Sequence, residues 1–192
     1  YAMKTELAEA KVRVLKLGEN RGRSSARNAG AGLLAADLLI FVDADCVVPD
    51  EEFLDAHVAA FEGGTVLGFG NILTPGPGFW NAIQRDSARW RREALAAGEL
   101  WTYTTQNVAV EARAFAQVGG FDPLFDRHGF EDRDLFIRLA KAGARVGFNE
   151  RARVVHEDKV GLASVCRKFR DAGLHSAWEF ADRHPAEYRR MS

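Results

Sequence analysis

The chain has 192 residues, of which 47% are apolar, so it contains enough apolar material for a domain with a buried core. Its 26 Lys and Arg residues nearly balance 27 Asp and Glu residues, which gives no reason to expect a nucleic-acid partner. No stretch is apolar for long enough to span a bilayer, and the first residues carry no secretory pattern. Cys46 and Cys166 are too few for a disulfide framework or a zinc site. We therefore expect a single cytoplasmic domain over residues 1–192.

In chain order, strand patterns and helix patterns alternate, which predicts an α/β fold. The clearest strand is the continuous apolar run of residues 38–42, which is typical of a strand buried on both faces of a sheet. The apolar residues of 162–182 recur at helical spacing, so this segment is expected to form one amphipathic closing helix. The other expected elements are a helix over residues 3–10, a strand over 11–17, helices over 24–36, 50–61, 79–97, 111–118 and 131–142, and strands over 65–73, 107–110, 144–148 and 152–155.

The strand over residues 38–42 leads directly into Asp43-Ala44-Asp45. Ligands of open α/β sheets gather at the carboxyl ends of strands, so both carboxylates are expected where chemistry occurs. Two neighbouring carboxylates repel each other unless a cation lies between them, and hard oxygen ligands suit Mg²⁺ or Mn²⁺ shared with substrate phosphates. The alternative is that Asp43 and Asp45 only form a turn or cap the next helix.

Glu131 and Asp132 begin a strongly amphipathic helix. The helix dipole favours negative charge in the first turn, and an ionised carboxylate near a substrate hydroxyl can accept its proton as a general base. The alternative is that Glu131, Asp132 and Asp134 are ordinary first-turn acids.

His156 follows an expected strand, as Asp45 does, and is a candidate for completing a metal site. The alternative is a histidine in a salt link with its acidic neighbours Glu157 and Asp158.

Several short motifs follow one another along the chain: residues 20–30 (NRGRSSARNAG), 41–45 (FVDAD), 107–110 (NVAV), 119–122 (GGFD), 129–135 (GFEDRDL) and His156. In this order they resemble the family 2 glycosyltransferases of the GT-A fold, over nearly the whole chain. Residues 107–139 also resemble the carboxyl-terminal module of galactosyltransferases.

The resemblance implies a GT-A-type, doubly wound, mostly parallel sheet flanked by helices. Family members open with a strand, a helix and a second strand that carry an acid for the nucleobase, and this sequence starts after them. We therefore expect an N-terminally incomplete fold, whose activity as a separate chain is in doubt. Its expected parts are a remaining donor and metal half over residues 1–62, an acceptor and catalytic half over 63–160, and a C-terminal amphipathic helix and tail over 161–192.

The resemblance also implies the chemistry, which is metal-dependent transfer of a sugar from a UDP- or GDP-type nucleotide sugar to an acceptor hydroxyl. Asp45 of the Asp-x-Asp (DxD) motif would ligate Mn²⁺ or Mg²⁺, Asp43 would contact ribose or metal, and His156 would be the third ligand. Asp132 would act as the general base and Glu131 would bind the acceptor hydroxyl. A single displacement would invert the configuration at the sugar carbon.

Further residues are assigned to the substrates by the same resemblance. Arg27, Ala44, Gln106 and Asn107 would line the donor site with Asp43 and Asp45, and Trp101 would contact the acceptor. That acceptor is expected to be a glycan, a lipid or a small molecule. Basic residues of the last helix can meet an anionic membrane surface, although a solvated polar face is the favoured interpretation. These residues are Arg167, Lys168 and Arg170.

Two alternatives come from other classes of protein. The first is a non-catalytic remnant of the fold that acts as an interaction domain. The second is a phosphatase of the haloacid-dehalogenase type, in which Asp43 would be phosphorylated and Asp45 would act as the acid.

Overall fold

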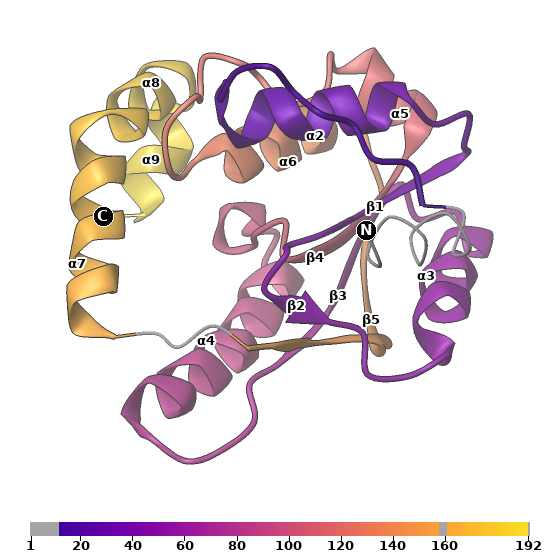
Figure 1. The fold of residues 1–192 in the computed structure, drawn as a ribbon, viewed down its shortest axis with the longest axis horizontal. Helices are drawn as coiled ribbons and strands as arrows, with labels where there is room; N and C mark the ends of the chain where they lie inside the picture. The colour runs from indigo at the N-terminus through magenta and orange to yellow at the C-terminus, as the bar shows by residue number, and fades with distance from the viewer. Residues whose placement is uncertain (1–11, 158–160, 192) are drawn as a thin grey trace.

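A computed structural model describes residues 12–157 and 161–191 and contains a five-stranded sheet flanked by helices (Figure 1). The helix expected over residues 3–10 lies outside the described residues. The strands are β1 (Leu38–Val42), β2 (Cys46–Val47), β3 (Leu67–Leu73), β4 (Asn107–Glu111) and β5 (Val146–His156). The helices are α2 (Gly22–Gly32), α3 (Glu52–Glu62), α4 (Phe79–Ala96), the 3₁₀ helix η1 (Leu100–Thr102), α5 (Ala112–Gln117), α6 (Glu131–Lys141), α7 (Leu162–Leu174), α8 (Ser176–Arg183) and α9 (Pro185–Met191).

The strand order is β1-β4-β3-β5-β2, and the sheet is mixed. The α/β class is confirmed, but the expectation of a mostly parallel sheet is corrected for the described strands, because β3 with β5 is the parallel pair and the other three pairs are antiparallel. This arises because β4 lies between β1 and β3 and runs against both. β1, β3 and β5 nevertheless share one direction, so the residues that follow β1 and β5 meet at the same edge.

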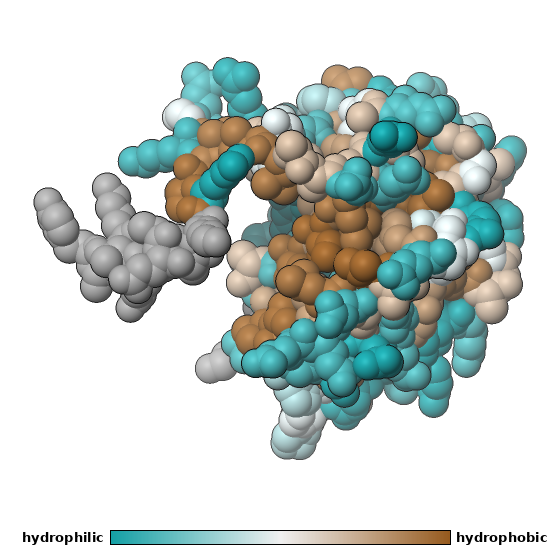
Figure 2. Space-filling view, turned by 90° about the vertical axis from the view of Figure 1, so that its right-hand side faces the viewer, coloured by the Kyte–Doolittle hydropathy of each residue, from teal (hydrophilic) through white to brown (hydrophobic). Residues whose placement is uncertain are grey.

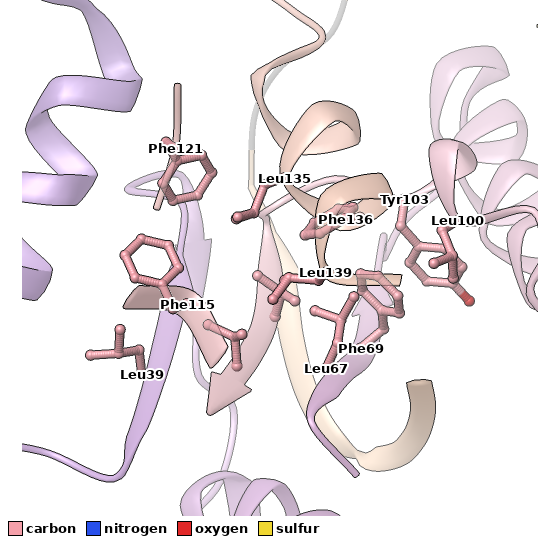
Figure 3. Close-up of a cluster of buried hydrophobic side chains, with 12 residues drawn as sticks. Leu39, Leu67, Phe69, Leu100, Tyr103, Phe115, Phe121, Leu135, Phe136 and Leu139 are labelled. Atoms are coloured by element: carbon pink, nitrogen blue, oxygen red, sulfur yellow. The ribbon is translucent and has the colours of Figure 1, made fainter. Parts of the chain in front are cut away.

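The core lies where α6 packs on the sheet (Figure 3). Phe69 of β3 stacks on Tyr103 at 4.0 Å between ring centroids and meets the edge of Phe136 at 4.9 Å. Each of these side chains is at most 4% exposed. Burial of one such side chain contributes about 1.5–3 kcal/mol, so this contact fixes α6, and with it the start of α6, against the sheet.

Four expected elements differ in the structure. Residues 12–17 form no regular secondary structure, and their apolar side chains are exposed. The strands expected over 144–148 and 152–155 are the single strand β5, whose pairing with β3 shifts register between Gly70 and Asn71. The expected closing helix breaks at His175, where the backbone has φ −126° and ψ −80°, and continues as α8.

The strand β1 is less buried than its apolar sequence predicts. Leu39 is its buried residue, whereas Val42 is 37% exposed. Other apolar side chains, such as Leu34, are exposed as well, and Figure 2 shows brown, apolar surface gathered on the face that lies to the right in Figure 1. Within the described residues, β1 has one neighbouring strand, β4, which explains why one long side of it is accessible.

No helix in the described part of the chain combines the length and the apolar character needed to cross a membrane.

Candidate active site

The helix α2 is fixed by two buried contacts with the segment that precedes α6. Ser24 Oγ donates to the backbone oxygen of Phe125 at 3.0 Å. Asn28 makes a reciprocal pair with Phe121, in which Nδ2 donates to its oxygen at 2.7 Å and Oδ1 accepts from its nitrogen at 2.9 Å. These bonds set the rotation of α2, so that Arg27 points toward the end of β1 and the start of α6.

Arg27 lies between two of the predicted carboxylates. Its Nη2 is 2.8 Å from Asp43 Oδ1, and its Nη1 is 3.2 Å from Glu131 Oε1. Charge-assisted bonds of this kind hold both carboxylates in defined positions. Arg27 therefore joins the strand-end motif to the helix-start motif, although Glu131 lies 104 residues after Arg27 in the sequence.

A cleft of about 350 Å³ lies at this point. Its walls come from α2, the end of β1, the helix α4, the segment before β4, the start of α6, the end of β5 and the helix α7. The predicted site residues that line it are Arg27, Asp43, Asp45, Gln106, Glu131, Asp132 and His156.

The start of α6 is shaped by an unusual backbone conformation. Phe130, the residue before the helix, has φ 72°, and Gly129 has φ 91°. A left-handed backbone is costly for a residue with a side chain, and such strain is found most often at functional sites. Here it turns the chain so that Glu131 and Asp132 occupy the first turn of α6 and line the cleft.

Glu131 is 2% exposed, and one of its carboxylate oxygens, Oε2, has no hydrogen-bond partner. Burial raises the pKa of Glu131, the neighbouring charge of Asp132 raises it further, and Arg27 and Arg23 oppose the change. A carboxylate with a free oxygen and a raised pKa can accept or share a hydrogen bond with a substrate hydroxyl.

Asp45 and His156 meet at the edge of the sheet. Asp45 Oδ2 is 3.5 Å from His156 Nε2, while His156 Nδ1 bonds the side-chain oxygen of Gln84 at 2.7 Å. The bond to Gln84 places the imidazole hydrogen on Nδ1 and directs Nε2 toward Asp45. This is the arrangement in which a histidine binds metal, because its other nitrogen is held by an acceptor.

These two side chains fit a divalent cation that takes its other ligands from a substrate. Ligand atoms about 2.1 Å from one ion are about 3–4 Å from each other, which suits the Asp45–His156 separation. Within residues 12–157 and 161–191, no group of three His, Cys, Asp or Glu side chains can hold a metal alone. Asp43, which is expected to contact ribose or metal, bonds Arg27 in this structure. The residues therefore fit a shared ion and do not form a closed metal site.

The pKa of the Cys46 thiol is affected by the negative charges of Asp45 and Asp43 as well as by burial. Its pKa is raised to about 12, first by burial and then by the charges of Asp45 and Asp43. A thiol with this pKa is protonated and unreactive at neutral pH, and the carboxylates that cause the change attract a cation.

Three predicted residues lie outside the cleft lining as far as the structure describes it. Ala44 occupies the turn between Asp43 and Asp45 without contributing to the wall. Trp101 is buried and lines an adjoining cavity. Asn107 is in the core, 1% exposed, with both amide hydrogens used. The expectation that Asn107 contacts the donor is corrected, because its side chain joins β4 to the backbone of β3 and β5.

Sequence reasoning missed several residues that the cleft brings together. Gln84 is an ordinary polar residue of α4, and no sequence signal indicates its bond to His156. Arg91, His128 and Arg133 line the cleft as well, and each would be read from sequence as a solvated charge. Of these residues, Arg133 could have been predicted from the sequence to lie near the site, because it directly follows the Glu131-Asp132 pair.

Comparison with known proteins identifies the family. Residues 2–118, more than half of the chain, match glycosyl transferase family 2, and residues 94–159 match a family described as the N-terminal domain of galactosyltransferase. The chain belongs to glycosyl transferase family 2. The expected galactosyltransferase resemblance is confirmed over a longer range, although the matched domain is described as N-terminal. Because the chain belongs to glycosyl transferase family 2, the alternative of a phosphatase of the haloacid-dehalogenase type is rejected.

A pre-mycofactocin glycosyltransferase, found in two strains of Mycobacterium tuberculosis, is 30% identical to this chain over 187 residues. The match covers 93% of this chain, which spans 39% of the length of those relatives.

Solved glycosyltransferases show the same GT-A fold. The mannosyltransferase PcManGT from Pyrobaculum calidifontis, in complex with GDP-Man and Mn²⁺, has a TM-score of 0.64 at 16% identity, over 95% of this chain and 50% of that one. GalNAc-T7 with UDP, GalNAc and Mn²⁺ has a TM-score of 0.57 at 19% identity. The match covers 81% of this chain and 34% of GalNAc-T7. Glucosyl-3-phosphoglycerate synthase from Mycobacterium tuberculosis has a TM-score of 0.54 at 13% identity. The match covers 88% of this chain and 61% of the synthase chain.

Proposed function

We propose that this domain transfers a sugar from a nucleoside diphosphate sugar to an acceptor hydroxyl, with a divalent cation and with inversion of configuration. The observation that carries the proposal is that one cleft contains Asp45 and His156 at one side and Glu131 and Asp132 at the other. The solved neighbours that hold GDP-Man or UDP together with Mn²⁺ support a nucleotide sugar and a cation.

In this proposal Asp132 is the general base. It lines the cleft and its Oδ1 accepts from the backbone nitrogen of Arg133 at 2.9 Å, which orients the carboxylate and leaves Oδ2 for the acceptor hydroxyl. Glu131, the neighbouring carboxylate in the cleft lining, binds that hydroxyl. The acceptor oxygen attacks the anomeric carbon through an oxocarbenium-like transition state as its proton passes to Asp132.

The leaving nucleoside diphosphate departs on the opposite side, toward Asp45 and His156. A divalent ion bound there supplies a Lewis acid for the charge that develops on the diphosphate. Arg27 holds Asp43 and Glu131 in place beside it. One displacement at carbon inverts its configuration, so the proposal specifies the anomer of the product.

Calorimetry of the full chain with UDP and with GDP, each with and without Mn²⁺, tests the donor site. We expect binding of one nucleotide that strengthens at least tenfold with Mn²⁺. Asp45→Ala should remove this strengthening, and the matched variant Asp55→Ala, in an exposed position on α3, should retain it. Absence of any Mn²⁺-dependent nucleotide binding would contradict the proposal and favour the interaction-domain alternative.

A second experiment separates binding from chemistry. Asp132→Asn should bind the nucleotide as the wild type does, and should lower sugar transfer by about 10²–10⁴-fold, the usual contribution of a general base. The anomeric coupling constant in the NMR spectrum of the product reports inversion or retention. Retention, or loss of nucleotide binding in folded Asp132→Asn, would overturn this division of roles.

A further inference from the structure

A second cavity of about 470 Å³ adjoins the candidate active site. Four residues line both cavities, namely Arg91, Phe130, Arg133 and Phe169. The two spaces therefore meet at these side chains, directly beside Asp132. A molecule that occupies the second cavity can reach the proposed base by passing between them.

The outer part of this second cavity is aromatic and apolar. Its walls come from α4, η1, the start of α6, α7 and α9. Trp90 is 55% exposed and Phe169 is 76% exposed, which is unusual for side chains of this size. The aromatic and apolar residues of the lining are Trp90, Trp101, Phe130, Phe169, Tyr188 and Met191.

The two arginines at the junction differ from the other arginines that line the two cavities. Arg23 and Arg27 pair with Glu131, Arg27 also bonds Asp43, and Arg190 pairs with Glu99 at 3.2 Å. Among residues 12–157 and 161–191, by contrast, no carboxylate forms a salt bridge with Arg91 or Arg133. The guanidinium of Arg133 lies over the ring of Phe130, 4.9 Å from its centroid.

The charge of Arg91 is poorly compensated. Burial lowers its pKa, the negative charge of Asp132 acts in the opposite direction, and the positive charge of Arg133 adds to the effect of burial. Two guanidinium groups that face a shared space without a carboxylate partner favour an oxyanion, since each planar fork can donate two parallel hydrogen bonds to it.

We infer that the acceptor is an anionic amphiphile, with a carboxylate or phosphate group bound between Arg91 and Arg133 and an aromatic or apolar body in the second cavity. This inference rests on the proposed function, since it assigns the second cavity to the acceptor. The oxyanion then holds the molecule so that a neighbouring hydroxyl lies at Asp132 and Glu131. The aromatic walls bury the body of the acceptor and exclude water from it.

Calorimetry with small probes tests the site without donor, metal or turnover. The full chain is titrated with 2-naphthoate, 2-naphthyl phosphate and neutral 2-naphthamide. We expect at least one anion to bind at least tenfold more tightly than the amide, and the two anions together distinguish a carboxylate site from a phosphate site. Equal binding of all three, or of none, would overturn the inference.

Arg91→Gln and Arg133→Gln should each weaken the preferred anion about tenfold or more, the usual effect of removing a charge-assisted hydrogen bond. Arg89→Gln is the matched control, because Arg89 is on the same helix, 69% exposed and paired with Asp86. Near-ultraviolet circular dichroism establishes that each variant is folded. Arg91→Lys keeps the positive charge at this position but lacks the planar guanidinium group that donates two parallel hydrogen bonds. Unchanged anion binding in both Gln variants would refute the assignment.

The two proposals fail in distinguishable ways. Mn²⁺-dependent nucleotide binding without anion binding would leave the glycosyltransferase proposal standing and reject the anionic acceptor. Anion binding that depends on Arg91 and Arg133, in a chain without nucleotide binding, would reject the donor site while the oxyanion site stands.

Discussion

Arg27 connects the two sides of the candidate site, because its guanidinium bonds Asp43 after β1 and Glu131 at the start of α6. Its position depends on Ser24 and Asn28, which bond the backbone of another segment. The carboxylates of the candidate site are thus held, through Arg27, by residues that have no chemical role in the proposal. In the same way, Gln84 holds His156 through its side-chain oxygen, and Gln84 has no chemical role of its own in the proposal.

The bond from Gln84 to His156 predicts a role in metal binding. Gln84→Leu removes the acceptor that fixes the imidazole, so we expect the Mn²⁺ concentration for half-maximal nucleotide binding to rise about 10–100-fold. Gln117→Leu, at an exposed position on α5, is the control. An unchanged Mn²⁺ requirement in folded Gln84→Leu would show that His156 needs no support from Gln84.

The raised pKa of Glu131 predicts that this carboxylate lowers stability at neutral pH. A raised pKa means that the folded state binds the proton more tightly than the unfolded state, so stability falls as pH rises from the unfolded pKa toward the folded one. Glu131→Gln is therefore expected to be more stable than the wild type at pH 7.5, by about 1.4 kcal/mol for each tenfold difference in proton affinity.

This gain should shrink as the pH falls below 4.5, the ordinary pKa of a glutamate side chain, because Glu131 is then protonated in both states. Urea unfolding at a series of pH values measures it, with Glu93→Gln on the exposed side of α4 as the control. A gain that instead grows in acid would show that Arg27 outweighs the cost of burial.

At the scale of elements, the sheet is tied together by one buried amide. Asn107 on β4 donates to the backbone oxygens of Asn71 on β3 and Ala152 on β5, at 3.1 and 2.8 Å, and its oxygen meets His57 Nε2 of α3 at 2.8 Å. Gly70 makes room for it, because a Cβ there would lie 2.5 Å from the Cγ of Asn107. This connection coincides with the register shift that carries β5 onward to His156.

Asn107→Ala should therefore destabilise the domain by about 2–4 kcal/mol, because it leaves two backbone oxygens and His57 without partners in the core. Urea unfolding measures the loss. Gln106→Ala changes the neighbouring amide, which lines the cleft, and should cost less than about 1 kcal/mol. Equal losses in the two variants would contradict a central role for Asn107 in the sheet.

At the scale of the molecule, the C-terminal helices complete the walls of both cavities. α7 lines the first cavity with Val165, Lys168, Phe169 and Ala172, and α9 lines the second. Asp134, which is 1% exposed, anchors the C-terminal helices to α6. Its Oδ1 lies 2.9 Å from His184 Nε2, and its Oδ2 accepts two hydrogen bonds from Arg138. The third acid of the α6 first turn thus has a structural role.

Asp134→Ala should cost about 3–5 kcal/mol, because it leaves Arg138 with an uncompensated charge beside the core. Amide hydrogen exchange should rise first in residues 176–191, which contain His184. Asp126→Ala, with a side chain that is 63% exposed, is the control. Unchanged protection of residues 176–191 in Asp134→Ala would show that the apolar contacts of Phe180 hold the helices without this charge.

The sequence by itself determined the α/β class, most element positions and the chemical types at the site, because these depend on local apolar periodicity and on short motifs at element ends. Asp43, Asp45, Glu131, Asp132 and His156 were predicted in this way, and the structure places them in the lining of one cleft. The tertiary structure alone decided that β4 runs against its neighbours, that Asn107 belongs to the core, that Gln84 bonds His156 and that Arg91 lines the cleft. Strand direction and side-chain partners depend on contacts between distant segments, and local sequence does not encode these contacts.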